Sequence, residues 1–474
     1  MQEFFHANQD ETNETIERFE KMLRGERTLY FDVHEIESLF DHFVETDNYE
    51  YAEKVLYAGL SLHPDAITLK TRQASLLTDQ DMLEEALELL NALVKIDAHN
   101  SDVFINMGWI YLKKDSVDTA LKYFETAVQL CGNDDKEELL LEIGINLNQS
   151  DYYTQAILFL NRCLAINPNN ENGLFELAYA FDKTDRTELS IATYEQLLSI
   201  NPYLENAWYN LGIQYNKCDR FQEAIEAYDF ALTINGDYSD AYFNKGNTLV
   251  NMGLFAQALD AYFEHASYKR DLNQTYQYIG DCWEQLGNAE MAIRFFQKSL
   301  ELDPLSADSM YGYCTALISL GKLDEAITMI QQALSINPMN PDYYFALSQA
   351  YLEKEDFKQC TESLELGLSL APEEILAWIE LLKIKAVYSK RFSSEAFMKK
   401  AWREYGQQNS ALMYLEAYIS FYLEKNIAKT KQKLSKAMEN DPLMIVEIKD
   451  EAAKMLANDE IKELIEHFRF QQKI

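Results

Sequence analysis

Apolar residues recur along most of the chain at the spacing that places them on one side of an α-helix. Segment 207–235 reads AWYNLGIQYNKCDRFQEAIEAYDFALTIN, and its large or small apolar positions are Trp208, Leu211, Gly212, Tyr215, Ala224, Tyr228 and Ala231. The first four follow the spacing i, i+3, i+4 and i+7, which indicates an amphipathic helix. The polar stretch 217–220 interrupts the pattern. The segment therefore predicts two helices joined by a short turn.

Prolines repeat at an interval of 34 residues. Pro168 and Pro202 are one interval apart, as are Pro304, Pro338 and Pro372. Proline lacks a backbone donor and clashes with the preceding helical turn, so it ends a helix. On this period we expect about twelve helix-turn-helix units, which start near Val33, Ile67, Ser101, Glu137, Glu171, Glu205, Ser239, Asn273, Ala307, Pro341, Ile375 and Asn409.

Residue types agree between periods as well as spacing. One further period contains Phe104, Met107, Gly108, Tyr111, Ala120, Phe124 and Ala127, and another contains Tyr276, Ile279, Gly280, Trp283, Ala292, Phe296 and Pro304. This combination resembles the tetratricopeptide-repeat pattern W-x2-L-G-x2-Y…A-x3-F…P, whose period is about 34 residues. The resemblance extends over nearly the whole chain.

The resemblance implies an all-α fold, a right-handed α-α superhelix in which each repeat packs on its neighbours. We expect an N-terminal acidic segment and capping helix in residues 1–32, with the helix near 12–24. About twelve repeats are expected in 33–444, and C-terminal capping helices in 445–474. Such caps cover the apolar faces that the end repeats leave exposed.

The charge of the chain narrows its partners. Lys and Arg number 42 and Asp and Glu number 78, a net charge of −36. This excess repels phosphates and anionic lipid, which argues against general binding of nucleic acid or membrane surfaces. The N-terminal sequence has no features of a secretory signal, and no apolar run reaches ~18 residues. We therefore expect a cytoplasmic protein.

The sequence contains no recognisable catalytic or metal-binding pattern. The six cysteines are widely spaced without a CxxC pair, and Cys163, Cys314 and Cys360 stand at small packing positions of the repeat. His34 and His42 share a helix face but lack further ligands at metal spacing. No phosphate-binding glycine loop, nucleophile elbow or HExxH occurs. The sequence therefore predicts no enzyme, no cofactor and no metal.

The resemblance also implies that the first helix of each repeat lines a concave groove, with the second, fifth, sixth, ninth, twelfth and thirteenth residues of the repeat pointing inward. The sixth residue is Asn106, Asn210 or Asn244 in three repeats. This is similar to a short version of the asparagine ladder of O-GlcNAc transferases, in which amides bind a peptide backbone. Glu142 and Glu176 interrupt it. Ordinary solvent-facing polar residues are the alternative.

Aromatic and acidic residues complete the candidate groove. Aromatic side chains beside polar ones suit a binding surface, although many are needed for packing. Acidic inward residues favour a basic or neutral segment. The candidate partner-binding residues are Asn106, Phe175, Tyr179, Asp182, Tyr209, Asn210, Phe243, Asn244, Asn247, Asp281, Glu284, Tyr311, Phe345, Gln349 and Lys383, with Asp308 and Asp342 as further inward acids.

One segment reverses the charge pattern. Residues 383–436 contain twelve basic residues, beginning with Lys383, and only four acidic ones. Three interpretations stay open: a docking site for an acidic partner, a head-to-tail contact with the acidic part of another copy, and a solvated basic face.

We therefore expect a non-catalytic scaffold that binds an extended peptide or protein segment in the groove of its repeats. The alternative is a structural protein that self-assembles head-to-tail through its acidic body and its basic C-terminal repeats.

Overall fold

The computed structural model describes residues 15–22, 24, 30–269, 272–388, 392–406 and 408–472, and within these ranges all regular structure is helical. None of these helices is both long and apolar enough to cross a bilayer. The first helices of the pairs are α2 (Val33–Glu45), α4 (Ile67–Asp79), α6 (Ser101–Lys113), α8 (Lys136–Gln149), α10 (Glu171–Lys183), α12 (Glu205–Lys217), α14 (Ser239–Asn251), α16 (Asn273–Gln285), α18 (Ala307–Ser319), α20 (Pro341–Glu353), α22 (Ile375–Tyr388) and α24 (Ser410–Tyr422).

The second helices are α3 (Tyr49–Leu62), α5 (Leu83–Ile96), α7 (Val117–Leu130), α9 (Tyr153–Ile166), α11 (Thr187–Ile200), α13 (Phe221–Ile234), α15 (Phe255–Tyr268), α17 (Ala289–Leu302), α19 (Leu323–Ile336), α21 (Phe357–Leu370), α23 (Ser394–Tyr405) and α25 (Ile427–Asn440). These helices form twelve tandem pairs in the described residues, which confirms the predicted helical repeats. Helices α8 and α24 begin at Lys136 and Ser410, each one residue from the predicted start.

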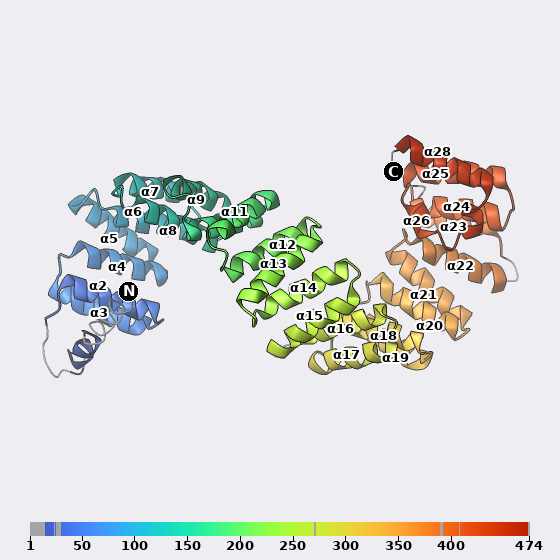
Figure 1. Ribbon diagram of the computed structural model, residues 1–474, viewed down its shortest axis with the longest axis horizontal. Coiled ribbons are helices and arrows are strands. Elements are labelled where there is room, and N and C mark those ends of the chain that lie inside the picture. The colour runs from blue at the N-terminus through green and yellow to red at the C-terminus, as the bar shows by residue number, and fades with distance from the viewer. Residues whose placement is uncertain are drawn as a thin grey trace. The chain divides into compact units, whose positions relative to one another are not determined.

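The chain divides into two compact units at Gln214–Tyr215, inside α12. Within each unit, consecutive pairs follow one another in chain order (Figure 1). In the second unit, for example, α16 packs on α17, α17 on α18, and α18 on α19. Each helix therefore buries its apolar side against the next in sequence, as in a linear repeat array.

In ten of the twelve pairs, from α2–α3 to α20–α21, the turn between the two helices contains one residue with left-handed backbone geometry. Asp219 adopts φ 57° between α12 and α13, and the next N–H, of Arg220, donates to the carbonyl oxygen of Tyr215 at 2.9 Å. Aspartate tolerates this conformation better than most residues, and glycine adopts it freely. The equivalent turns contain Asp47, Asp81, Asp115, Asp151, Asp185, Gly253, Gly287, Gly321 and Glu355, all with positive φ.

The turn between pairs is fixed by an Asn or Asp side chain just after the second helix. Asn201 accepts a hydrogen bond from the N–H of Tyr203 at 3.2 Å, and Asn337 does the same for Met339 at 3.3 Å. Such side-chain turns replace a backbone turn. Pro202 and Pro338 lie inside these turns and prevent the helix from continuing. Where the period places glycine instead, Asn235 makes the same bond to Asp237 at 3.2 Å.

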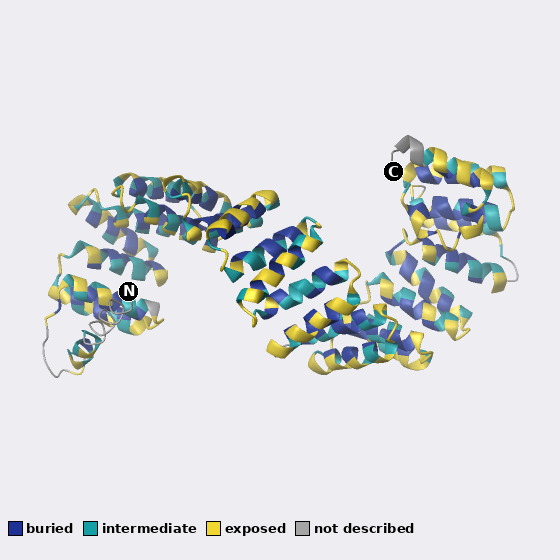
Figure 2. Cartoon of the chain, in the orientation of Figure 1, coloured by how far each residue is buried: buried dark blue, intermediate teal, exposed yellow. Residues whose placement is uncertain are grey.

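In four of the pairs, a glycine of the first helix faces a large residue of the second and allows the two helices to pack closely. A Cβ atom on Gly246 of α14 would lie 2.6 Å from a ring carbon of Tyr262 in α15, and one on Gly280 of α16 would lie 2.7 Å from the ring of Phe296 in α17. Gly108 and Gly144 face Phe124 and Leu160 in the same way. The large partners of these glycines are fully buried. Figure 2 shows that buried positions recur along the helices of both units. Backbone contact at glycine thus sets how near the two helices pack.

Both ends of the array are covered. In the described part of the predicted N-terminal cap, residues 15–22 are helical, and Phe19 is fully buried with its ring 6.0 Å from that of Phe31. Residues 12–14 and 23 of that predicted helix, with the rest of the N-terminal segment, lie outside the described residues. At the other end, α26 (Met444–Glu447), α27 (Ala453–Leu456) and α28 (Asp459–Gln472) cover the last pair, where Ile461 is buried in the same core as Leu434.

Candidate functional site

In the first unit, candidate residues of α10 and α12 converge on Tyr194, a buried residue of α11. The ring of Phe175 lies 5.8 Å from that of Tyr194 in an edge-on contact. Burial raises the pKa of Tyr194, and the negative charge of Asp182 adds to the effect, whereas a hydrogen bond from Asn210 opposes it. The three candidates are therefore brought together, but around a packing residue of the second-helix layer.

The remaining candidates of this unit are more dispersed. The Asn106 amide donates to the carbonyl of Asp102 in its own helix, at 2.8 Å. The Tyr179 ring lies 6.1 Å from that of Tyr153, and the ammonium of Lys183 lies 5.2 Å from its centre. Tyr209 is half-buried on α12. Because α8 and α10 carry Glu142 and Glu176 at the ladder position, Asn106 and Asn210 do not form a continuous row.

In the second unit, aromatic side chains pack together at α14 to α16. The Phe243 ring contacts the rings of Tyr262, His265 and Tyr278 with centroids 5.8, 5.1 and 5.6 Å away. The Tyr262 hydroxyl donates to the side-chain oxygen of Asn247 at 2.7 Å. Phe243 and Asn247 are half-buried, and both contact the buried Tyr262. Together with Tyr278 they form an aromatic cluster beside the acidic residues of α16.

Carboxylates gather next to this cluster, on α16 and α18. Burial raises the pKa of Asp281 to about 7, and the negative charges of Glu284 and Asp308 add to the shift. Burial also raises the pKa of Glu284, although a hydrogen bond from Thr315 opposes this. Among the described residues, no cation forms an ion pair with Asp281. We call Asp281, Glu284 and Asp308 the acidic cluster.

Two tyrosines border the acidic cluster. The ring of Tyr311 in α18 lies 5.5 Å from that of Tyr343 in α20. The hydroxyl of Tyr343 donates to Asp308 at 3.1 Å. Burial raises the pKa of Tyr311, and the charges of Asp342, Glu284 and Asp281 contribute. The negative field therefore extends from α16 across α18 to α20.

Four other candidates lie apart from the acidic cluster. Phe345 of α20 directs its ring against the backbone of Gly367 in α21, so it is mainly a packing residue. Gln349 is exposed, and its amide lies 3.5 Å from Glu353 in the same helix. Lys383 of α22 forms an ion pair with Glu451, which follows α26. Asn244 is half-buried on α14.

Sequence reasoning missed part of this site. Thr315 and Tyr343 were not among the candidate residues, yet the first bonds Glu284 and the second bonds Asp308. Thr315 stands 34 residues after Asp281, at the same inward position of the next repeat. The period therefore contained a signal for Thr315, whereas Tyr343 occupies a position expected to pack in the core.

The basic segment is partly neutralised inside the chain. Lys383, Lys385, Lys429, Lys431 and Lys433 pair with Glu451, Glu365, Glu424, Glu460 and Glu416 respectively. Lys390 and Arg391 lie outside the described residues. The surplus of positive charge predicted from the sequence is thus smaller at the surface than the count of basic residues suggests.

The buried thiols occupy packing positions. Cys163, Cys314 and Cys360 are buried, as predicted, and so is Cys282. Burial raises the pKa of Cys360 to about 12 and that of Cys163 to about 11, so these thiols stay protonated near neutral pH. Within the described residues, no group of three His, Cys, Asp or Glu side chains is arranged to hold a metal ion.

Tandem helix pairs with a repeated small-against-large contact define an all-helical repeat protein. Tetratricopeptide-repeat family models match residues 101–134, 172–203 and 341–374, residues 205–238, and residues 285–348. The chain is a tetratricopeptide-repeat protein. A search of curated proteins gave no match.

Many solved structures are similar to parts of the chain. A MamA structure is 28% identical, with a TM-score of 0.34, and the match covers 35% of this chain and 96% of MamA. A structure of the APC/C hetero-tetramer Cut9–Hcn1 is 15% identical with a TM-score of 0.37, over 85% of this chain and 89% of the other. The C-terminal part of a repeat protein from Cytophaga hutchinsonii is 18% identical with a TM-score of 0.43, over 50% and 98%.

Proposed function

We propose that the chain is a non-catalytic scaffold that binds an extended, arginine- or lysine-containing segment of a partner protein along α16, α18 and α20. Tetratricopeptide-repeat proteins generally bind protein or peptide partners. The observation that carries the more specific proposal is the acidic cluster: the charges of Glu284 and Asp308 act on the partly buried Asp281, no cation forms an ion pair with it among the described residues, and its pKa is raised to about 7.

The electrostatics favour a cationic ligand. Like charges that share a partly buried site disfavour ionisation, and an introduced cation reverses this effect. A guanidinium that binds near Asp281 would therefore gain more binding free energy than one that binds beside an exposed, solvated carboxylate. Perturbed ionisable groups of this kind are typical of functional sites.

The neighbouring aromatic residues suit the same ligand. Tyr311 presents a half-buried ring beside the carboxylates, and the buried ring of Tyr343 supports it from behind at 5.5 Å. An arginine can stack on such a ring while donating to a carboxylate. The half-buried rings of Phe243 in α14 and Tyr278 in α16, which pack on each other, would supply apolar contact for the rest of the segment.

The pH dependence of binding tests this proposal. The affinity for a rhodamine-labelled peptide SRRLARRS, measured by fluorescence anisotropy, is expected to rise about tenfold between pH 6 and pH 8. The sign follows from Asp281, because its pKa of about 7 leaves it mostly protonated at pH 6, and a bound guanidinium favours the ionised form. Binding therefore releases a proton, and it strengthens as pH rises. Arginine itself stays charged over this range.

The variant D281N is the matched control for this measurement. It should bind more weakly and show a nearly flat pH profile, while the neutral peptide SQQLAQQS should bind little to either protein. An equal rise with pH in wild-type protein and D281N would assign the effect to other groups and remove Asp281 from the site.

The alternative function is head-to-tail self-assembly through the acidic body and the basic C-terminal repeats. The overall charge of −36 and the basic segment favour it, whereas the internal ion pairs of Lys383, Lys385 and Lys431 leave fewer cations for a second copy. Self-assembly would give a sedimenting mass that rises with concentration and falls with added salt, because exposed ion pairs are screened.

A further inference from the structure

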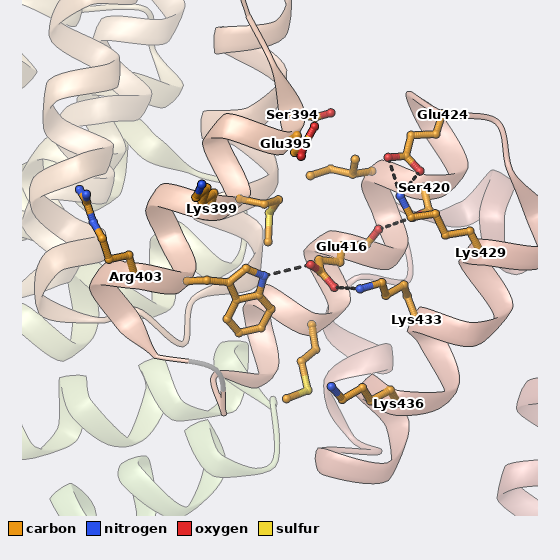
Figure 3. Close-up of a pocket in the computed structure, with 14 residues that line it drawn as sticks. Ser394, Glu395, Lys399, Arg403, Glu416, Ser420, Glu424, Lys429, Lys433 and Lys436 are labelled. Atoms are coloured by element: carbon orange, nitrogen blue, oxygen red, sulfur yellow. Dashed lines mark hydrogen bonds and ion pairs between the residues drawn. The ribbon is translucent and has the colours of Figure 1, made fainter.

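A cavity of about 630 Å³ opens between α23, α24 and α25, away from the first-helix residues discussed above. Figure 3 shows Lys399 and Arg403 of α23 on one side, and Lys429, Lys433 and Lys436 of α25 on the other. The two lysine-bearing helices thus border one space. We call this cavity the basic cleft.

The floor of the basic cleft is apolar and well supported. Met398, Met413 and Ile419 are buried beneath it, and the Trp402 indole is half-buried in its wall. The indole N–H donates to one oxygen of Glu416 at 3.0 Å, and Lys433 pairs with the other at 2.5 Å. This bridge joins α23, α24 and α25, so the cleft is formed before any ligand arrives.

The cations of the basic cleft are not all used internally. Glu416 and Glu424 are occupied by Lys433 and Lys429. Lys399 and Lys436 have no ion-pair partner in the described part of the chain, and Arg403 lies 4.0 Å from an exposed Glu404. Two or three positive groups therefore remain for a ligand on opposite sides of an apolar floor, against one lining carboxylate, Glu395, that forms no ion pair in the described part of the chain.

The geometry points to a second docking site, in which the basic cleft binds an acidic segment of a partner protein that carries carboxylates on both sides of an apolar side chain. The apolar side chain would contact Met398, Trp402 and Met413, while the carboxylates would pair with Lys399 and Lys436. Charge complementarity specifies the sign of the ligand, and the thioether-and-indole floor specifies its apolar centre. The scaffold would then hold a basic segment and an acidic segment at separate sites.

The test is the binding of a rhodamine-labelled peptide SEDLFEDS, compared with SQNLFQNS and SEDSSEDS. Anisotropy should show binding of the first peptide and at least about tenfold weaker binding of the other two. The charge-reversal variant K399E/K436E should weaken SEDLFEDS binding at least about 30-fold. The matched control K400E/K425E changes two exposed lysines of the same segment that do not line the cleft, and should reduce affinity by less than about threefold.

Each other outcome overturns the proposal. Equal losses in K399E/K436E and K400E/K425E would show that only the general field attracts the peptide. Equal binding of SEDLFEDS and SEDSSEDS would show that the apolar floor does not contribute to peptide binding. If no acidic peptide binds, but wild-type protein sediments as a salt-sensitive oligomer that K399E/K436E disperses, the occupant is a second copy. Circular dichroism and thermal melts verify that both variants fold, and retained SRRLARRS binding separates this site from the acidic cluster.

Discussion

The triple variant D281N/E284Q/D308N is expected to bind SRRLARRS at least about 30-fold more weakly than wild-type protein at pH 8, a loss of ~2 kcal/mol. Glu284 of the same helix and Asp308 of α18 both act on Asp281 through their negative charge, and no cation pairs with Asp281 among the described residues, so a ligand guanidinium would supply the missing charge. Hydrogen bonds to charged groups contribute about 1.5–3 kcal/mol each, so losing the charge of all three removes a large part of the binding energy.

The matched control is E290Q/E301Q/E325Q. These three glutamates are exposed on α17 and α19, on the second helices of the same repeats. Both variants therefore change the net charge equally. If the control loses as much affinity as the cluster variant, the peptide responds only to the overall charge, and the acidic cluster is not its site.

As pH rises, Asp281 should make the folded chain less stable while it strengthens binding of the basic peptide. The folded-state pKa of Asp281, about 7, is above its ordinary value of 3.8. The folded state therefore holds the proton more tightly than the unfolded state does. The contribution of Asp281 to the free energy of unfolding is greatest below pH ~4, and it is lost as pH rises through 7. D281N should raise the melting temperature more at pH 8 than at pH 5. A lower melting temperature at pH 8 would show instead that Asp281 supports the fold.

Substituting G280L is expected to lower the free energy of unfolding of its region by about 1–3 kcal/mol through overpacking. The Phe296 ring lies between Gly280 of α16 and Gly312 of α18, and a Cβ at either position would overlap it. Phe296 is fully buried and cannot swing into solvent. The leucine side chain must therefore push α16 away from α17.

The effect should be local, because contacts in a repeat array are between neighbours. Hydrogen exchange followed by mass spectrometry should show faster exchange in α15 to α18, with weaker SRRLARRS binding because the acidic cluster lies on α16 and α18. The control is G236A, since Gly236 has open space around it and lies in a turn between pairs. Unchanged exchange in G280L would mean that the glycine-to-ring contact does not set the helix spacing.

The fold could be predicted from the sequence because its signals are local and repeated. The apolar spacing in 207–235 places α12 and α13, and the prolines place the ends of the second helices. Asp219 and its equivalents supply a further signal, since a left-handed residue recurs at the same turn. Each helix pair repeats the same residue pattern, so a pair whose own pattern is weak can still be placed from the neighbouring periods.

The candidate site was less predictable, because its chemistry depends on contacts between repeats. Asp281 and Glu284 could be assigned to one helix face from their spacing of three residues, and Asp308 from its inward position. The hydrogen bonds of Asn210 and Asn247 to tyrosines could not be predicted, because these tyrosines were expected only as packing residues. The ion pair of Lys383 with Glu451 joins residues 68 positions apart, beyond the reach of any local pattern.

Site-specific photo-crosslinking locates the bound segment most directly. Benzoylphenylalanine introduced at Tyr311, beside the acidic cluster, should crosslink to SRRLARRS on irradiation. The same group at Tyr313, whose hydroxyl accepts a hydrogen bond from Gln297 of α17 at 2.9 Å, should not. Crosslinking at position 311 that is abolished by excess unlabelled peptide is the predicted result. Equal crosslinking at 311 and 313, or none at 311 at saturating peptide, would contradict binding along α16, α18 and α20.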